Sequence, residues 1–322
     1  MTIAIIGAAG FIGSKLRKSL EQDNIVASYF DIEVGTSDSR CQHMDVEDTQ
    51  TLEKLNGTDI LLNLAAVHAD NIKPKSKYYD VNVTGAENVC DIARKFNIKK
   101  IIFTSSVAIY GFSPPNTGEN GKPNFFNEYG RTKYLAEQVY VNWQKEDPKA
   151  RTLCIIRPTV VFGEDNEGNV NRLIQQILNK KFIMFGSGHN VKSMAYVGNI
   201  VEFLKFSLKI EGGSHVYNYV DKPDLTMNEL ISLIRTIGLG EKKAILRLPL
   251  WFGLLATRLI DVISGLSRVQ FNISYIRMRK FSQTTQFNSS IKSIGFVQPH
   301  SLEAGLKRTI HHILSTNRNN DA

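Results

Sequence analysis

The sequence predicts an α/β protein, built on a doubly wound parallel sheet with a smaller mixed C-terminal lobe. Short apolar strand patterns alternate with helical patterns through the first half of the chain, and such alternation is typical of parallel sheets covered by helices on both faces. The pattern loosens after about residue 165. We therefore predict one domain over residues 1–165, with returns to its sheet at about 192–220, and a substrate-binding lobe over residues 166–322.

The first predicted strand, Ile3–Ile6, runs directly into glycines at positions 7, 10 and 13, and a helical pattern begins at Phe11. A strand, a glycine turn and a helix N-terminus in this order form the dinucleotide-binding turn of Rossmann folds. The glycines allow the tight turn, the approach of the pyrophosphate and close packing of helix on strand, while free amides of the helix face the phosphates. The predicted cofactor contacts here are Gly7, Ala9, Gly10, Phe11, Ile12 and Gly13.

The second predicted strand, Ile25–Phe30, is followed by Asp31, 18 positions after Gly13. A carboxylate at this place accepts the adenosine ribose hydroxyls, and it would repel a 2′-phosphate. The predicted cofactor is therefore NAD. Further strands are expected at Cys41–Met44, Asp59–Leu64, Lys100–Thr104 and Thr152–Arg157. Small residues after the Asp59–Leu64 strand would let the cofactor lie against the backbone, so we include Leu64, Ala65 and Ala66 in its site.

Tyr129 and Lys133 are four positions apart near the start of a helix predicted to run to about Lys145, so they share one face. The ordinary pKa of a tyrosine is near 10, too high for a base at neutral pH. A neighbouring ammonium group and the cationic ring of oxidised nicotinamide both favour the phenolate. With the Ser106 hydroxyl holding the reacting oxygen, this set could remove a proton from a secondary alcohol while NAD takes the hydride.

These features, with Ser105-Ser106 and the run Arg157–Gly163, resemble the extended short-chain dehydrogenase/reductase family, and within it the NAD-dependent sugar 4-epimerases. Phe287–Phe296 is similar to the closing segment of that family. The resemblance implies that Ser106 and Tyr129 act on a 4-hydroxyl, that Lys133 holds the ribose and tunes Tyr129, and that Pro158 borders the nicotinamide. The other predicted cofactor contacts are Asp45, Val46, Asn82 (on a helix over about 75–96), Thr104, Tyr129, Lys133 and Val160.

Departures from the family pattern bear on the substrate. The 4,6-dehydratases carry an Asp-Glu pair where this chain has Val107 and Ala108, so dehydration is not expected. The motifs with which UDP-sugar epimerases bind the nucleotide or its diphosphate have no match at Lys192–Asn199 or near Arg277–Phe281. The segments 192–201 and 217–225 instead resemble bacterial epimerases acting on N-acetylglucosaminyl-diphospho-undecaprenol. The predicted substrate-binding residues are His68, Ser106, Val107, Asn169 and Lys192.

The net charge is +8, and residues 241–322 carry 12 basic and 4 acidic residues, so the whole excess lies in the last quarter. The same region holds an apolar segment over about 248–266, interrupted by Arg258 and Asp261 and too short to span a bilayer. This combination suits a lipid-linked diphosphate at the inner face of the cytoplasmic membrane. A core helix beside solvated basic residues is the competing interpretation.

The leading hypothesis is thus an NAD-dependent 4-epimerase that interconverts GlcNAc and GalNAc on undecaprenyl diphosphate, in O-antigen (lipopolysaccharide) assembly. The alternatives are a UDP-GlcNAc or UDP-glucose 4-epimerase, a 4-ketosugar reductase and a non-catalytic NAD-binding regulator. The resemblance implies a homodimer through helices near 75–96 and 129–145. Nucleic acid is not an expected partner, because charge alone favours it.

Other local patterns give smaller predictions. The first strand begins within the first three residues with no signal-type segment before it, which favours a cytoplasmic protein. The cysteines are far apart and are expected to be reduced core residues, with no metal site. A capping box at Thr226–Glu229 predicts a helix to Ile237. A closing helix is expected at Ser301–Leu314, followed by a disordered tail at 315–322.

Overall fold

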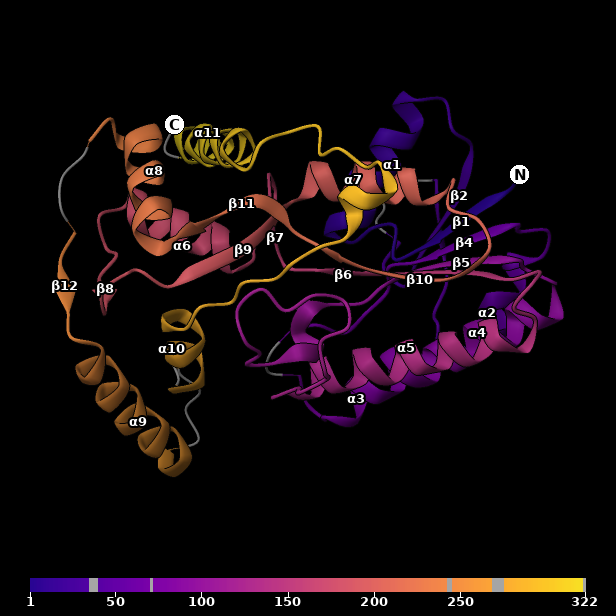
Figure 1. The fold of residues 1–322 in the computed structure, drawn as a ribbon, viewed down its shortest axis with the longest axis horizontal. Helices are drawn as coiled ribbons and strands as arrows, with labels where there is room; N and C mark the ends of the chain where they lie inside the picture. The colour runs from indigo at the N-terminus through magenta and orange to yellow at the C-terminus, as the bar shows by residue number, and fades with distance from the viewer. Residues whose placement is uncertain (35–39, 70–71, 242–244, 268–274, 321–322) are drawn as a thin grey trace. The chain divides into compact units, whose positions relative to one another are not determined.

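The structure is a computed structural model that describes residues 1–34, 40–69, 72–241, 245–267 and 275–320 (Figure 1). The chain forms two compact units. Unit 1 comprises Met1–Val161, Ala195–Val220 and Phe287–His300, and unit 2 comprises Phe162–Met194, Asp221–Gln286 and Ser301–Ala322. The chain therefore passes between the two units several times.

Within the described residues, unit 1 contains a sheet of seven parallel strands in the order β10-β6-β5-β4-β1-β2-β3. The predicted doubly wound parallel sheet is confirmed. Winding reverses between β1 and β4, and ligands of such sheets bind at the carboxyl ends of the strands at this point. The strands are β1 (Ile3–Ile6), β2 (Ala27–Asp31), β3 (Cys41–His43), β4 (Ile60–Asn63), β5 (Lys100–Thr104), β6 (Thr152–Pro158) and β10 (Gly213–Tyr219).

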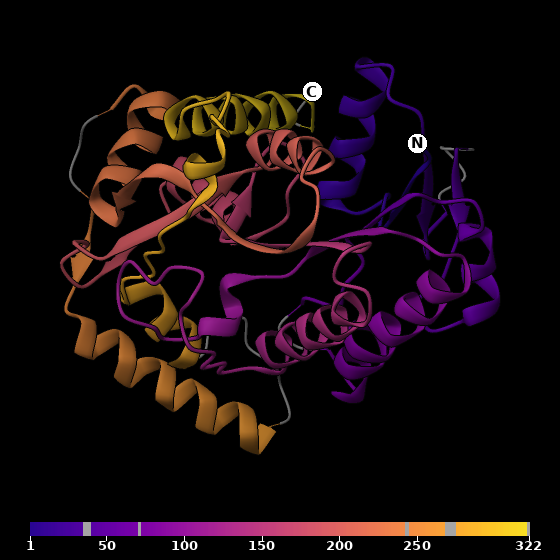
Figure 2. The ribbon, with the colours of Figure 1, turned by 45° about the vertical axis from the view of Figure 1, so that its right-hand side comes forward.

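Helices cover both faces of this sheet, as the alternation of buried strand residues requires. Ile3 and Ile5 of β1 belong to the apolar cluster formed with α1 (Phe11–Gln22) and α7 (Val197–Ser207). Ala4 and Ile6 point the other way, into the cluster formed with α4 (Gly85–Lys95) and α5 (Glu128–Glu146). Figures 1 and 2 show α4 and α5 side by side beneath the sheet. All three cysteines are buried within these layers.

The helix predicted over about 75–96 is interrupted by a π turn. It consists of α3 (Ser76–Tyr79), the π segment η2 (Asp80–Thr84) and α4. The widened turn contains Asn82, whose buried amide is bonded to neighbouring elements on two sides. π turns inside helices are often found at functional sites. Shorter helical segments of unit 1 are α2 (Thr49–Leu52), η1 (Glu53–Leu55), η3 (Val107–Tyr110) and η4 (Ile291–Ile294).

The segment Phe287–His300 completes the core of unit 1. The Phe296 ring packs against Phe203 and Phe206 of α7, with centroid distances of 5.0 and 5.5 Å. The Ser290 amide donates to the Glu119 carboxylate at 2.8 Å. These contacts fasten a late part of the chain onto the sheet.

Unit 2 is smaller and mixed, as predicted. One sheet has the order β11-β9-β7, where β9 and β11 are antiparallel and both β7 and β9 extend across the boundary of the unit; β8 and β12 form a second pair. Helices α6, α8 and α11 pack together, and α10 contacts α9. The elements are β7 (Val160–Phe162), α6 (Asn169–Leu178), β8 (Met184–Phe185), β9 (Val191–Tyr196), β11 (Asp221–Thr226), α8 (Met227–Leu239), β12 (Arg247–Leu248), α9 (Leu250–Ser267), α10 (Tyr275–Ser282) and α11 (Leu302–Asn320).

Two helix ends test the sequence predictions in unit 2. The Thr226–Glu229 capping box is present, and α8 runs to Leu239, where Gly240 ends it in the left-handed conformation. The predicted disorder after Leu314 is wrong for residues 315–320, because α11 continues to Asn320. Buried Ile310 and Ile313 anchor this helix, and extending an anchored helix costs little. Residues 321–322 lie outside the described residues.

Across the described part of the chain, no helix combines the length and the hydropathy needed to cross a bilayer.

Candidate active site

The glycine turn after β1 has the geometry of a phosphate cradle. A Cβ at Gly13 would lie 2.1 Å from the Gly7 carbonyl oxygen, so only glycine lets α1 pack this closely on the turn. At Gly10 a Cβ would meet only the Gly7 oxygen, at 3.4 Å, so its outer side is open. Helix α1 has no side-chain cap and no acidic residue in its first turn. Its N-terminus can therefore receive an anion, and the residues present fit a dinucleotide.

Asp31 lies at the end of β2, beside this turn. Its carboxylate accepts the amides of Ala9 at 2.8 Å and Glu33 at 3.2 Å. The side chain thus joins the glycine turn to the second strand, and it remains the predicted ribose ligand. Leu64, Ala65 and Ala66 follow β4 and are half-buried. A Cβ at Gly7 would lie 2.7 Å from the Ala65 amide, so this loop packs directly on the turn.

Asn82 is more constrained than the sequence suggested. Its Oδ1 accepts the Val67 amide at 2.9 Å, and its Nδ2 donates to the Val67 carbonyl at 3.1 Å and to the Thr132 hydroxyl at 3.0 Å. Asn82 therefore fastens the loop after β4 to α5, which fixes the backbone on which a cofactor would lie.

The remaining predicted cofactor residues lie at or just after the carboxyl ends of the parallel strands of unit 1, and Val160 follows Pro158 by two positions. Asp45 and Val46 follow β3, and the Val46 carbonyl accepts the Asn88 amide at 2.9 Å. Thr104 ends β5, and its buried hydroxyl has no hydrogen-bond partner among the described residues. An orphaned hydroxyl there is consistent with a polar ligand. Pro158 ends β6, and Val160 begins β7.

Packing of α5 on the loop after β5 brings Tyr129 to Ser106. Asn127 caps α5, with its Oδ1 accepting the Gly130 amide at 2.9 Å. A Cβ at position 130 would lie 2.5 Å from the Ala108 carbonyl oxygen. The first turn of α5 can thus touch η3 only because residue 130 is glycine.

The hydroxyl groups of Ser106 and Tyr129 share a hydrogen bond. Ser106 Oγ accepts the Ala108 amide at 3.1 Å, which leaves the serine proton free to be donated to the tyrosine oxygen. Burial raises the pKa of Tyr129, and the bond with Ser106 lowers it by less, so the pKa stays above its ordinary value. The sequence predicts that Lys133 lowers the pKa of Tyr129. In the protein without cofactor, Lys133 does not contribute to the shift of this pKa.

Lys133 lies one turn further along α5 and is 2% exposed. Its Nζ is 4.3 Å from the centroid of the Phe103 ring, a cation–π contact. Burial lowers the pKa of Lys133 to about 7, while the Glu137 carboxylate raises it. Ser106, Tyr129 and Lys133 all lie in unit 1, so the predicted catalytic set is brought together there.

The predicted substrate residues are divided between the units. His68 is exposed in the loop after β4, and Val107 opens η3. In unit 2, Asn169 is exposed at the start of α6. Lys192 is half-buried, and its Nζ donates to the carbonyls of Lys280 at 2.7 Å and Gln283 at 2.6 Å. These bonds hold β9 to the end of α10.

Sequence reasoning missed several residues that shape the site. Asn127 and Gly130 could have been noticed as a helix cap and a small residue inside the Tyr129–Lys133 segment. The ion pair between Glu137 and Arg157 left no local signal, because its partners are 20 residues apart. The same is true of the buried hydroxyls of Ser105 and Thr159, which have no hydrogen-bond partner in the described structure.

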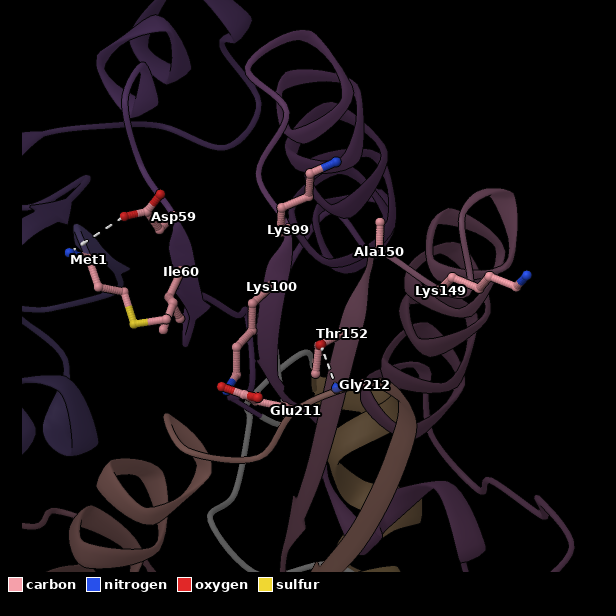
Figure 3. Close-up of a pocket in the computed structure, with 10 residues that line it drawn as sticks. All are labelled: Met1, Asp59, Ile60, Lys99, Lys100, Lys149, Ala150, Thr152, Glu211 and Gly212. Atoms are coloured by element: carbon pink, nitrogen blue, oxygen red, sulfur yellow. Dashed lines mark hydrogen bonds and ion pairs between the residues drawn. The ribbon is translucent and has the colours of Figure 1, made fainter.

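A separate hollow of about 500 Å³ lies at the opposite, amino-terminal edge of the sheet (Figure 3). Its lining includes Lys99, Lys100 and Lys149 with Asp59 and Glu211. The Lys100 ammonium is already bound to the carbonyls of Leu208 and Ile210. The hollow is distant in the fold from the strand ends that carry Ser106, so it is not the predicted site.

Comparison with known proteins agrees with this geometry. The model of the NAD dependent epimerase/dehydratase family matches residues 3–219, and the chain belongs to that family. It is 44% identical over 313 residues to N-acetyl-alpha-D-glucosaminyl-diphospho-ditrans,octacis-undecaprenol 4-epimerase of Escherichia coli O157:H7, which covers 96% of this chain and 94% of the relative. It is also 26% identical to UDP-glucose 4-epimerase of Vibrio cholerae, over 98% of this chain and 96% of that one.

A solved structure shares the fold. The UDP-glucuronic acid 4-epimerase from Bacillus cereus, in complex with NAD, superposes with a TM-score of 0.75 and 21% identity, covering 98% of this chain and 99% of its own. The fold comparison, the family match and the glycine turn agree on an NAD-dependent protein of the extended short-chain dehydrogenase/reductase type.

We predict that Gly130→Ala lowers turnover of the sugar substrate by about 10- to 100-fold, because the added Cβ must push α5 away from Ala108 and separate Tyr129 from Ser106. Steady-state kinetics, with NAD binding measured in parallel, check this. Gly118→Ala is the matched control, since a Cβ there meets nothing within 4 Å. Full turnover by folded Gly130→Ala would contradict the role of this contact.

Proposed function

We propose that this protein is an NAD-dependent sugar 4-epimerase that interconverts GlcNAc and GalNAc linked to undecaprenyl diphosphate. The observation that carries the reaction type is the hydrogen-bonded pair of Ser106 and Tyr129 with buried Lys133 on the next turn of the same helix. The lipid-linked carrier is supported by the similarity to the E. coli epimerase named for that substrate.

Tyr129 is the proposed proton carrier. Its oxygen takes the proton of the sugar 4-hydroxyl and returns it after the 4-keto sugar has turned over in the site. NAD held at the glycine turn and by Asp31 would supply reversible hydride transfer at C4, with no net oxidation of the sugar. With the sugar bound, Ser106 donates its single hydroxyl proton to the reacting oxygen in place of Tyr129, and so holds that oxygen in line with Tyr129. Val107 and Ala108 offer no acid or base for a dehydration.

The charges around Tyr129 determine when its phenol can act as a base. The protein alone keeps the phenol protonated, because burial raises its pKa. A positive charge placed beside the phenol lowers the pKa and favours the phenolate. Lys133 is suited to hold the ribose hydroxyls and to add positive charge while it is protonated. We therefore propose that base strength in this site depends on the cofactor.

The proposed NAD site uses the predicted contacts along the carboxyl edge of the unit 1 sheet. The glycine turn binds the pyrophosphate, Asp31 accepts the adenosine ribose hydroxyls, and Thr104 offers its orphaned hydroxyl to the ligand. The remaining proposed contacts are Asp45, Val46, Leu64, Ala65, Ala66, Asn82, Pro158 and Val160. The proposed substrate-binding residues are Asn169 and Lys192 in unit 2 and His68, Ser106 and Val107 in unit 1.

A membrane-facing role for α9 is supported by the direction of its side chains. Gly253 and Thr257 are buried, and a Cβ at Gly253 would lie 2.6 Å from the Phe185 ring, so this face packs on β8. The other face exposes Trp251, Phe252 and Leu255, which are 65%, 48% and 53% exposed. An outward apolar face on a helix that lacks the hydropathy to cross a bilayer is typical of an interfacial helix.

Basic residues flank this apolar face. Arg258, one turn beyond Leu255, is exposed and lies 5.1 Å from the Tyr275 ring of α10. Arg247 and Arg279 are also exposed in the neighbouring elements β12 and α10. Cations beside an apolar surface match anionic lipid headgroups and a lipid diphosphate. We propose peripheral binding of this surface to the inner face of the cytoplasmic membrane, in O-antigen assembly.

The proposed oligomer is a homodimer through α4 and α5, which run side by side along one face of unit 1. Sedimentation velocity that found only monomer at micromolar concentration would contradict it.

The decisive experiment offers the purified protein two donors, GlcNAc-diphospho-undecaprenol and UDP-GlcNAc, without added NADH. We expect GalNAc to form on the lipid-linked donor, because the second unit lacks the nucleotide-binding motifs of UDP-sugar epimerases. Chromatography of the released sugars provides the measurement. Turnover of the UDP-sugar alone would replace the lipid-linked assignment with a UDP-sugar epimerase. In a parallel assay with added NADH, net consumption of NADH would indicate a reductase.

Tyr129→Phe is expected to lower turnover by at least about 100-fold, because the phenyl ring keeps the packing but cannot carry a proton. NAD binding should remain close to that of the wild type, which fluorescence titration measures. Tyr134→Phe on the same helix is the matched control and should turn over normally. Unchanged turnover by Tyr129→Phe would favour a non-catalytic NAD-binding regulator.

Trp251→Glu/Leu255→Glu is expected to lower binding to phosphatidylglycerol–phosphatidylethanolamine vesicles by at least about ten-fold, because two exposed apolar side chains no longer enter the lipid. Flotation of vesicles measures binding. Val26→Glu/Val297→Glu is the control, since these side chains are 87% and 81% exposed on unit 1. Equal binding by both variants would argue that α9 is not the membrane surface.

A further inference from the structure

Glu137 lies on α5 four residues after Lys133. Side chains at this spacing are neighbours on one helix face, with Cβ atoms about 6 Å apart. The Glu137 side chain is only 1% exposed. Arg157 of β6 holds its carboxylate at both oxygens, with Nε donating to Oε1 at 2.8 Å and Nη2 donating to Oε2 at 2.6 Å. A two-point contact of this kind fixes the orientation of the carboxylate.

Arg157 is itself fixed from the other side. Its Nη1 donates to the Tyr110 hydroxyl at 2.6 Å and to the Glu119 carbonyl at 2.9 Å. The Tyr110 hydroxyl donates in turn to Asn218 Oδ1 at 2.8 Å. The guanidinium therefore has little freedom to turn away, and the Glu137 carboxylate stays beside the face of α5 that carries Lys133.

A buried ion pair generally makes only a small net contribution to folding stability. Two charges lose their hydration on burial, and well-packed apolar residues often stabilise a protein as much or more. The negative member of the pair, the Glu137 carboxylate, does however lie on the same face of α5 as the buried Lys133 ammonium, and Arg157 fixes its orientation. The apolar layer between α5 and the sheet includes Phe103, Tyr140 and Trp143, all buried. A buried cation in such surroundings needs a compensating charge.

We propose that Glu137 is a positioning residue for the catalytic set: its carboxylate, oriented by Arg157, favours the charged form of the buried Lys133 side chain. The proposal deepens the proposed function, since it rests on Lys133 acting in the epimerase reaction.

The acid–base balance of Lys133 supports this role. Burial lowers the pKa of Lys133 to about 7, and Glu137 is the charged group that opposes the decrease. Other ionisable groups in this part of unit 1 include Tyr129 and Tyr140 on α5, Cys90 on α4, Tyr110 on η3 and Arg157 on β6. A lysine is charged below its pKa and neutral above it, so the ammonium is lost as pH rises through about 7. Without the Glu137 charge this loss must occur at a lower pH.

Glu137→Gln tests the proposal in the whole protein. We expect the pKa of Lys133 to fall by at least about one unit, and the alkaline limit of NAD binding to fall with it. NMR titration of protein labelled with ¹³C at lysine Cε measures the pKa directly, and the Lys133 signal is assigned by its absence in Lys133→Met. Glu137→Asp keeps the charge and should restore much of the wild-type pKa.

Glu146→Gln is the matched control on the same helix. Glu146 is half-exposed and pairs with Arg94 at 2.7 Å and Arg151 at 2.6 Å. Its loss removes ion pairs of α5 without touching the surroundings of Lys133, so the Lys133 titration should be unchanged. If Glu137→Gln does not fold, Glu137→Gln/Arg157→Met removes both charges and should lower the Lys133 pKa by a smaller amount.

A folded variant without Glu137 in which Lys133 titrates as in the wild type would overturn the proposal and leave the pair a purely structural role. The titration requires neither substrate nor turnover. A failure of the proposed epimerase activity would therefore be distinguishable from a failure of this inference.

Discussion

The arrangement of the catalytic set depends on the close approach of two backbones, at Gly130 of α5 and Ala108 of η3. Since no side chain stands between them, the first turn of α5 rests on the segment that follows β5, and Tyr129 reaches Ser106. The Asn127 cap and the Asn82 bridge to Thr132 hold the same helix from its start and its side. The chemistry proposed for Tyr129 therefore depends on a contact made by residues with no chemical role of their own.

Burial fixes the positions of the side chains in this site, and it also disfavours their charged forms. The same packing that immobilises Lys133 lowers its pKa, and the packing around Tyr129 raises the pKa of the phenol. Both shifts oppose the ionic forms that the reaction needs. Fixed charges and hydrogen bonds, from Glu137 to Lys133 and from Ser106 to Tyr129, oppose these shifts. The site thus combines apolar packing with a few polar groups whose orientation cannot vary.

Local patterns made much of this predictable. The glycine turn, the alternation of strands with helices and the Tyr129–Lys133 spacing are local patterns, so the sequence was sufficient for them. The Glu137–Arg157 pair and the Asn82 bridge join residues far apart in the chain, and no periodicity reveals them. For α9, composition indicated an apolar helix, but only packing against Phe185 decides that Trp251 and Leu255 face outward. The prediction of disorder after Leu314 was wrong for residues 315–320. Buried Ile310 and Ile313 anchor α11, and this packing outweighs the polar composition of its last residues.

Unit 1 is built from three segments of the chain that are separated by parts of unit 2, and this has a consequence for synthesis of the protein. Phe296 fills the apolar layer beside Phe203 and Phe206, and β10 adds the last strand of the sheet. Both segments leave the ribosome after long stretches of unit 2. The nucleotide-binding unit therefore cannot close its core until Phe296 has been translated. A chain stopped before Phe296 would expose that layer, and it would be a natural target for chaperones and proteases.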